Sequence, residues 1–521
     1  MNPAMPKHIV DELIAEKSHA LKLTVDVKAQ APSCRVWYDS VMDEQPPFGI
    51  TPDDWEATPP AVRAVIMVLL VRIADLEARL NQHSGNSSKP PSSDPPSAPP
   101  RPTKVPRGRQ SGGQPGHPGH HRPLLPPDDD RIKQIIPVPP AQCRHCHTPL
   151  DPALPDARTP ERRQVWDIPP IQPEVTEYQL RALQCPQCAE ITRATPPAGM
   201  PPGGYGAHAT ALAACLHGRF RLSDHETAEV MQDAFGLPMS EGTVTTVEVT
   251  MSAALEPVYQ EIQTSVQQQT RVNLDETSWK QGRAGQVGLR KGWLWVAVTQ
   301  LCTLFLIWGK RNGAALDTML GTSWRGIITS DRWRVYERFL VAARQLCWAH
   351  LKRDITAFVE YARDGPVHDW SARALIQIDL MFVLWHGYRS GELDRATLQH
   401  GMAAIQGAFH TLLEDGTVVP NAKVQSFSHG LLRLEAALWT FVREEGVEPT
   451  NNAAERALRP AVLWRKGCFG TQSDGGSRYV ERMLTVSATC KQQDRHLLSF
   501  LTESLEAHWA GTPPPRLLQI P

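Results

Sequence analysis

The chain has 521 residues, of which 41% are hydrophobic and 21% are charged, and its 54 basic and 55 acidic residues give a net charge of −1. A chain of this length is expected to form about two to four domains. The balanced charge excludes a chain that is basic throughout, so affinity for nucleic acid has to come from local charge. No apolar run reaches the roughly 18 residues of a membrane span, and the N-terminus has no signal-peptide pattern, which predicts a cytoplasmic protein.

Three segments are expected before the first cysteine pair. Residues 1–60 lack a clear period and are predicted to be a poorly ordered extension. Residues 61–82 have apolar side chains at alternating steps of four and three, which fits either a dimerising coiled coil or a helix packed on its own domain. Residues 83–130 are rich in Pro, Ser and Gly and are predicted to be a disordered linker. Its cations can contact phosphate groups or remain solvated. They include Lys89, Arg101, Lys104, Arg107 and Arg109.

Residues 131–200 carry two Cys-x-x-Cys pairs, Cys143 with Cys146 and Cys185 with Cys188. A two-residue gap lets both thiolates of a pair bind one tetrahedral Zn²⁺, and two pairs complete a closed structural site. His145 and His147 are alternative ligands. The β-type segments 164–168 and 175–183 lie between the pairs and could form the hairpin of a zinc ribbon. We therefore expect a small zinc-binding domain.

Residues 201–268 have a helical pattern. One predicted helix starts at the cap residue Ser223 and ends at Gly236, and a second starts near Ser240. Two helices joined by a short turn resemble a helix-turn-helix DNA-binding region. An ordinary helical hairpin remains the alternative, because neither helix is notably basic.

The next part of the chain alternates strands and helices. Strands are expected at 272–277, 293–298, 304–308, 327–331 and 345–348, with a helix at 314–320 and another before the last strand. Residues 354–445 are predicted to be a helical insertion. The order favours a multidomain α/β protein with a ribonuclease-H-like catalytic core, formed by residues 269–353 and 446–505 and followed by a C-terminal tail, 506–521.

Three acidic residues stand at the ends of these predicted elements. Asp275 lies on the first strand, Asp331 ends the fourth, and Glu455 opens a later helix. Carboxylates that meet at one point can hold two Mg²⁺ or Mn²⁺ ions for phosphoryl transfer on nucleic acid. The neighbouring Glu276 is expected on the opposite face of its strand, because side chains alternate along a strand.

Each acid also has an ordinary structural explanation. Asp275 could stand beside a turn, Asp331 could form a surface ion pair with a neighbouring arginine, and Glu455 could complete a helix capping box with Asn452. Cations that follow Glu455 suit a bound polyanion, although Arg459 could instead form a salt bridge within its helix. These cations are Arg456, Arg459, Arg465 and Lys466.

From about residue 60 to the end, the chain resembles the transposases of the insertion sequence 66 family, bacterial enzymes of the DDE class. The linker resembles the family's signatures at 86–94 and 112–117, and the paired cysteines resemble its zinc-binding region. Three motifs carry the resemblance in the core: Leu274 to Thr277, Ser330 to Tyr336 with Cys347 to His350 after it, and Glu448 to Pro460. The second has Asp331-Arg332-Trp333 where many relatives have Asp-Gly-Tyr.

The resemblance implies that Asp275, Asp331 and Glu455 form a catalytic triad. We hypothesise a DNA transposase that binds the ends of its element, cleaves a strand with metal assistance and transfers the freed end to target DNA. A homodimer or larger assembly is expected, with accessory proteins from the same element as possible partners. A ribonuclease-H-like nuclease or resolvase without strand transfer, and a non-catalytic zinc-containing DNA-binding protein, are the alternatives.

Overall fold

The computed structural model describes residues 55, 57, 122–282, 290–362 and 364–518. The chain divides into two compact units, which are described separately. Unit 2 contains the described residues of Pro102–Val175 and Asp233–Leu237, whereas unit 1 contains Thr176–Gln232 and the described residues from Pro238 onward. The predicted extension 1–60, the helix 61–82 and the linker cations from Lys89 to Arg109 lie largely or wholly outside the described residues.

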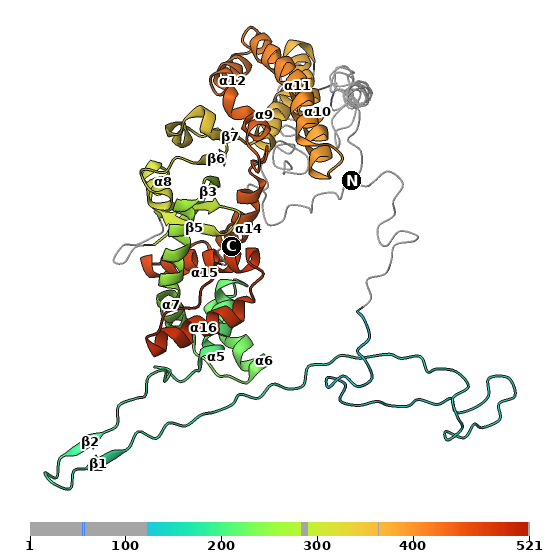
Figure 1. The fold of residues 1–521 in the computed structure, drawn as a ribbon, viewed down its shortest axis with the longest axis vertical. Coiled ribbons are helices and arrows are strands. Elements are labelled where there is room, and N and C mark those ends of the chain that lie inside the picture. Colours follow the sequence, from blue (N-terminus) through green and yellow to red (C-terminus); the bar gives the residue numbers. More distant parts are fainter. Residues whose placement is uncertain (1–54, 56, 58–121, 283–289, 363, 519–521) are drawn as a thin grey trace. The chain divides into compact units, whose positions relative to one another are not determined.

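A five-stranded sheet forms the centre of unit 1 (Figure 1), in the order β5-β4-β3-β6-β7. Its strands are β3 (Arg271–Gln281), β4 (Arg290–Val298), β5 (Thr303–Trp308), β6 (Ile327–Ser330) and β7 (Arg344–Leu346). β3, β4 and β5 pair antiparallel, whereas β6 and β7 run parallel to β3. The chain is therefore a mixed α/β protein, as expected from the strand pattern.

The apolar content of the central strands explains their position. β5 and residues 293–298 of β4 are almost wholly buried, as predicted for continuous apolar runs rather than alternating ones, whereas Arg290 and Lys291 at the start of β4 are exposed. The predicted helix at 314–320 is confirmed as α8 (Gly313–Leu320). The helix expected between the last two strands is wrong. Two 3-10 helices, η2 (Arg334–Arg338) and η3 (Val341–Ala343), occupy that segment in its place.

Helix α15 (Asp474–Gln492) closes the outer edge of β5. The backbone N–H groups of Thr303, Phe305 and Ile307 donate to the side chains of Thr489, Thr485 and Glu481, respectively. Every second strand residue advances about 6.6 Å and every fourth helix residue about 6 Å, so the two spacings match. The side chains of one helix thus satisfy an edge that would otherwise expose unpaired donors.

Helix α14 (Asn452–Cys468) packs on β3 and β4. Its N-cap residue Asn451 is fully buried, and its side chain donates to the carbonyl oxygen of Leu274 at 2.7 Å and accepts from the Asn273 amide at 3.1 Å. The start of α14 is therefore fixed against the middle of the sheet.

The predicted helical character of residues 201–268 is confirmed, with α5 (Ala207–Gly218), α6 (Asp224–Phe235) and α7 (Glu241–Gln268). Ser223 and Glu226 form a capping box before α6, and Ser240 caps α7 by accepting from the Thr243 N–H. Gly236, at φ +64°, ends α6 as predicted. α16 (Leu497–Ala510) packs on α5 and α7.

Between β7 and α14 the chain is helical, as predicted for 354–445, although its first helix starts earlier, at Trp348. Trp348 anchors the aromatic core of this region, with ring centroids 5.0 Å from Phe409 and 4.9 Å from Trp439. The elements are α9 (Trp348–Tyr361), α10 (Gly365–Arg389), α11 (Arg395–Gly416), α12 (Ala422–Arg433), η4 (Glu435–Leu438) and α13 (Thr440–Arg443). Among the helices of the described residues, none is long and apolar enough to cross a membrane.

The expected hairpin between the cysteine pairs is wrong. Residues 164–168 form no strand, and only β1 (Ala182–Gln184), which pairs with β2 (Ile191–Arg193), overlaps the predicted segment 175–183. The side chains of Val165 and Val175 are 95% and 91% exposed, so they do not pack against a hydrophobic core as strand residues would. Prolines interrupt the intervening stretch and remove backbone donors that a strand ladder requires.

Candidate active site

Asp275 lies on β3, and Asp331 immediately follows its parallel neighbour β6. Asn273 of β3 pairs with Thr329 of β6, and both chains continue for two residues in the same direction to reach the two acids. Asp275 still pairs with Val296 of β4 on its other side, so it belongs to the middle of the sheet. The predicted placement of these acids on adjacent strands is therefore found in the structure.

Glu455 reaches this region from the first turn of α14. It does not form the capping box considered from sequence, because α14 starts one residue earlier than that box requires. The cap residue is Asn451, and its side chain is directed to β3 without capping the helix. The surface ion pair of Asp331 with Arg332 that was considered from sequence is not formed among the described residues, since Arg332 pairs with Asp354 at 2.7 Å.

The three acids influence one another electrostatically. Burial raises the pKa of Asp275 well above its usual range, and the negative charges of Glu276, Asp331 and Glu455 raise it further. Burial also raises the pKa of Asp331, while the Trp333 N–H and Arg311 oppose that shift. A carboxylate group held this way favours either a proton or a cation, because both relieve the same repulsion.

Glu276, the residue after Asp275 on β3, lies in a cationic and aromatic pocket. Its carboxylate accepts from the Arg311 guanidinium and from the Tyr336 hydroxyl. Arg311 in turn lies over the rings of Trp333, at 3.7 Å, and Trp293, at 4.6 Å. Burial and the charge of Asp331 raise the pKa of Glu276. The role of Arg311 was not evident from sequence, because it lies 35 residues from its partner.

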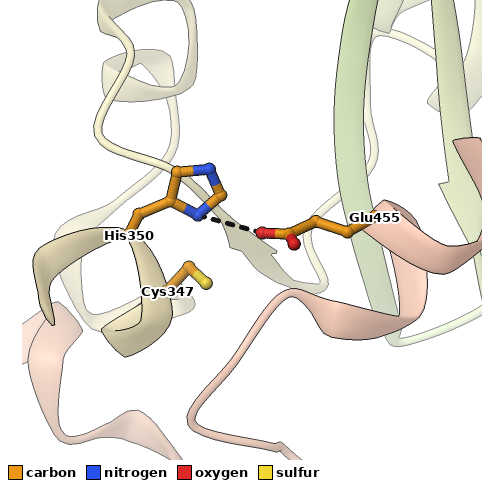
Figure 2. A group of neighbouring side chains, drawn as sticks. All are labelled: Cys347, His350 and Glu455. Atoms are coloured by element: carbon orange, nitrogen blue, oxygen red, sulfur yellow. Dashed lines mark ion pairs between the residues drawn. The ribbon is translucent and has the colours of Figure 1, made fainter. Parts of the chain in front are cut away.

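A second set of side chains meets Glu455 from the opposite direction (Figure 2). His350, on the first turn of α9, places Nδ1 3.3 Å from Glu455 Oε1. The Cys347 thiol, at the N-cap of α9, lies with them so that one ligand atom of each residue falls within 4.8 Å of the others. Burial lowers the pKa of His350 to about 3, so its ring is neutral. This pair was not identified as metal ligands from the sequence, although the Cys-x-x-His spacing from Cys347 to His350 is a signal that could have done so.

The four cations predicted after Glu455 have different environments. Arg465 is committed to the fold, because it donates to the Thr277 and Ser278 hydroxyls and to the Ser278 carbonyl oxygen on β3. Arg456 and Arg459 are exposed, and Lys466 is half-buried. Arg456 lines two cavities, one on each side of α14.

The first cavity, of about 580 Å³, lies between α9, α10 and the start of α14. Its wall combines the cations Arg353, Arg389 and Arg456 with the rings of Phe382 and Trp385. Glu448 pairs with Arg389 at 2.7 Å. The second cavity, of about 410 Å³, includes Arg219, Arg221 and Lys491. Cationic side chains, among them Arg456, therefore line both cavities.

Each Cys-x-x-Cys pair forms a knuckle with the same backbone pattern. The Cys143 N–H donates to Thr148, and His147, at φ +58°, donates back to Cys143. In the other knuckle the Cys185 N–H donates to Glu190, and Ala189, at φ +60°, donates back to Cys185. The Thr148 hydroxyl and backbone lower the pKa of Cys146 to about 7, and backbone donors lower the pKa of Cys185. One cysteine of each knuckle therefore favours the thiolate that binds zinc.

Known protein families match both the part of the chain that carries the three acids and the part that carries the cysteine knuckles. Residues 203–479, which include all three acids and the helical region, match the family described as Transposase IS66 family. Residues 140–189 match the zinc-finger binding domain of transposase IS66 and contain all four cysteines of the knuckles. Residues 36–123 match a family of unknown function.

Two curated proteins from Sinorhizobium fredii are similar to this chain. The uncharacterized protein y4hP is 24% identical over 423 residues, which cover 76% of this chain and 75% of that protein. The uncharacterized protein y4qI is 26% identical over 274 residues, or 48% of this chain and 49% of that protein. Their names assign no activity, so the acids and the knuckles have to carry the functional argument.

Proposed function

The chain belongs to the transposase IS66 family and carries that family's zinc-binding domain, and we propose that it uses Asp275, Asp331 and Glu455 to cleave DNA at the ends of its element and to join a freed end to target DNA. The observation that carries this proposal is the adjacency of Asp275 and Asp331 on β3 and β6, with Glu455 delivered by a helix packed on the same sheet.

The sheet supports a ribonuclease-H-like core. Three antiparallel strands in sequence order are followed by two parallel strands on the other side of β3. This order puts the first strand in the centre, between the second strand and the fourth. Acids on the first and fourth strands are therefore neighbours, which is the arrangement that a carboxylate metal site on this sheet requires.

The acids fit hard divalent cations. Oxygen ligands suit Mg²⁺ and Mn²⁺, and the burial and mutual repulsion that raise the pKa of Asp275 are relieved by positive charge at the same place. When bound, such ions would neutralise phosphate charge and activate the attacking hydroxyl. Asp275 and Asp331 would hold them from the sheet, and Glu455 would hold them from α14.

The remaining residues of the site position these acids. Asn451 ties the start of α14 to β3, so Glu455 cannot move independently of Asp275. The Trp333 N–H donates to Asp331 at 2.9 Å and fixes the orientation of its carboxylate. Arg311 forms an ion pair with Glu276 and so compensates a fourth negative charge close to the acids.

Cations near Glu455 support DNA binding along α14. Arg456 and Arg459 are exposed, and the cavities on both sides of α14 add Arg353, Arg219 and Lys491. Backbone phosphates bind such cations without sequence preference. Arg465 is better assigned to holding α14 on β3 than to DNA.

Recognition of the element ends is assigned to the zinc-binding domain and to helices α5 to α7. The linker cations from Lys89 to Arg109 would add affinity that falls with salt. Cleavage at two ends requires two active sites, so a homodimer or larger assembly is proposed, with accessory proteins of the same element as further partners.

The test is incubation of the full-length protein with an element-end duplex and a target duplex in Mg²⁺ or Mn²⁺. Cleavage and strand transfer are expected for the unaltered chain, and loss of both is expected for Asp331→Ala and Glu455→Gln. Asp415→Asn is the control, because Asp415 forms an exposed pair with Arg373 in the helical insertion. Full activity of either acid variant would overturn the assignment, and cleavage without joined product would favour a nuclease.

A further inference from the structure

Cys347, His350 and Glu455 form a compact group of three different metal-ligand types. Their Sγ, Nδ1 and carboxylate oxygen atoms all lie within 4.8 Å of one another (Figure 2). Two of the residues begin α9 and the third begins α14, so the group joins two helix starts that are about a hundred residues apart in sequence. A thiol, an imidazole and a carboxylate are the three side chains from which zinc sites are built.

The distance between two of these atoms fits a shared ion. Zinc binds nitrogen and carboxylate oxygen at about 2.0–2.2 Å, and two ligands in tetrahedral geometry are then about 3.3–3.5 Å apart. His350 Nδ1 lies 3.3 Å from Glu455 Oε1. His350 Nδ1 is also buried and has no hydrogen-bond partner among the described residues. A buried nitrogen that approaches a carboxylate without a hydrogen bond is explained by a cation placed between them.

The backbone holds the group in place. The His350 N–H donates to the Cys347 carbonyl oxygen at 3.1 Å, and the Trp348 N–H donates to the Pro449 carbonyl oxygen at 3.0 Å, which joins the two helix starts. The Asn451 N–H donates to Cys347 Sγ at 3.1 Å. Backbone N–H donors of this kind stabilise the negative charge of a metal-bound thiolate.

We propose that Cys347, His350 and Glu455 bind one further zinc-class ion, with water as the fourth ligand. Sulfur and imidazole nitrogen select zinc over magnesium, whereas the oxygen ligands Asp275 and Asp331 select the harder ion. Binding transfers the Cys347 thiol proton to solvent, and the imidazole keeps its ring proton on Nε2. The site shares Glu455 with the acids of the proposed function, but it goes beyond that function because Cys347 and His350 belong neither to the acid group nor to the cysteine knuckles, and it assigns no catalytic step.

The first experiment measures zinc bound by the full-length protein in excess Mg²⁺. Cys347→Ser and His350→Gln are each expected to lose one zinc equivalent relative to the unaltered chain. Cys302→Ser is the matched control, because Cys302 is an equally buried thiol outside the group. Asp275→Asn is the second control, because it removes a ligand proposed for magnesium and none proposed for zinc.

Two results with the variants would overturn the proposal. Unchanged zinc content in both Cys347→Ser and His350→Gln would exclude the site, and equal loss of zinc in Asp275→Asn would assign the ion to the acid group instead. X-ray absorption at the zinc edge of the unaltered protein avoids any folding defect of a variant. Mixed sulfur and nitrogen or oxygen ligation is expected, and sulfur ligation alone would contradict the site. Neither measurement needs transposase activity, so this site and the proposed function can fail separately.

Discussion

The side-chain amide of Asn451 donates a hydrogen bond of 2.7 Å to the carbonyl oxygen of Leu274, the residue immediately before Asp275. Asn451 is also the N-cap of the helix that carries Glu455. One buried side chain therefore sets the position of two proposed catalytic acids that are separated by 180 residues. A change at Asn451 should disturb their geometry without removing either carboxylate.

Asn451→Ala is expected to lower the free energy of unfolding by about 1–3 kcal/mol, because it leaves the Leu274 carbonyl and the Asn273 side chain without their partner. Strand cleavage should fall by about 10²-fold, since misplacement of reacting groups has costs of that order. Chemical denaturation and a single-turnover cleavage assay measure the two effects.

Asn421→Ala is the control for Asn451→Ala. Asn421 caps α12 in the helical insertion by accepting from the Lys423 and Val424 N–H groups. Its loss should cost about 1 kcal/mol of stability and leave cleavage unchanged. Equal cleavage by both variants would show that Asn451 does not position the acids.

Asp275→Asn is expected to stabilise the metal-free protein at pH 7. Burial and neighbouring negative charges raise the pKa of Asp275, so its ionisation costs stability as the pH rises above the ordinary value of 3.8. The variant lacks that cost, but it should lose cleavage by at least about 10²- to 10³-fold. Thermal unfolding of both proteins with EDTA and with Mg²⁺ measures the stability difference. Only the unaltered chain should gain stability from Mg²⁺. An unaltered chain that is the more stable of the two without metal would contradict the prediction.

Glu481→Gln is expected to remove a pH dependence of stability. Burial raises the pKa of Glu481 to about 8 against its ordinary value of 4.5, although Arg478 opposes the shift. Because the folded pKa is raised, the stability contributed by protonated Glu481 is full below about pH 4.5 and is lost as the pH rises toward 8. Keeping the proton at pH 7 costs up to about 3 kcal/mol, and Gln needs no proton to accept from the Ile307 N–H.

Thermal unfolding of both proteins between pH 5 and 8 tests this dependence. The stability of Glu481→Gln relative to the unaltered chain should increase across this range. Thr485→Val serves as the comparison, because it removes the neighbouring acceptor for Phe305 without removing a titrating group. A difference that stays constant with pH would mean that Glu481 is ionised throughout.

Ala189→Val is expected to weaken zinc binding by the knuckles about 10- to 100-fold. Ala189 has φ +60°, where a β-branched side chain is strained by about 1–3 kcal/mol. Ala189→Gly should bind zinc at least as well, since glycine adopts this conformation freely. Competition with a chelator measures the affinities, and equal binding by both variants would show that the knuckle geometry is not required.

Local patterns in the sequence were sufficient for the elements that carry the acids. The buried apolar runs that became β4 and β5, the capping residues Ser223 and Ser240, and the position of Asp331 at the end of a strand all depend on neighbours within a few residues. Such features can be predicted because hydrophobic period and helix caps act locally. The parallel neighbours β3 and β6 followed from the order of the strands.

The other features of the fold and of the site could not be predicted, because they depend on contacts between residues that are far apart in the sequence. Asn451 contacts Leu274, and Arg311 contacts Glu276, through side chains whose pairing no local pattern encodes. The predicted strand at 164–168 was wrong because β-type residues form a strand only where a partner strand and a buried face exist, and Val165 has neither in the described structure. The group of Cys347, His350 and Glu455 could not be predicted, because only the fold brings His350 close to Glu455.

Both borders of the central sheet are already occupied. α15 fills the donors of β5, and on the other border the Thr440 hydroxyl donates to the Arg344 carbonyl oxygen of β7. Two copies of this chain therefore cannot fuse their sheets into one continuous ribbon. A synaptic assembly on paired DNA ends would have to be held by helices, by the zinc-binding region or by the DNA itself, so that its formation can depend on the substrate being present.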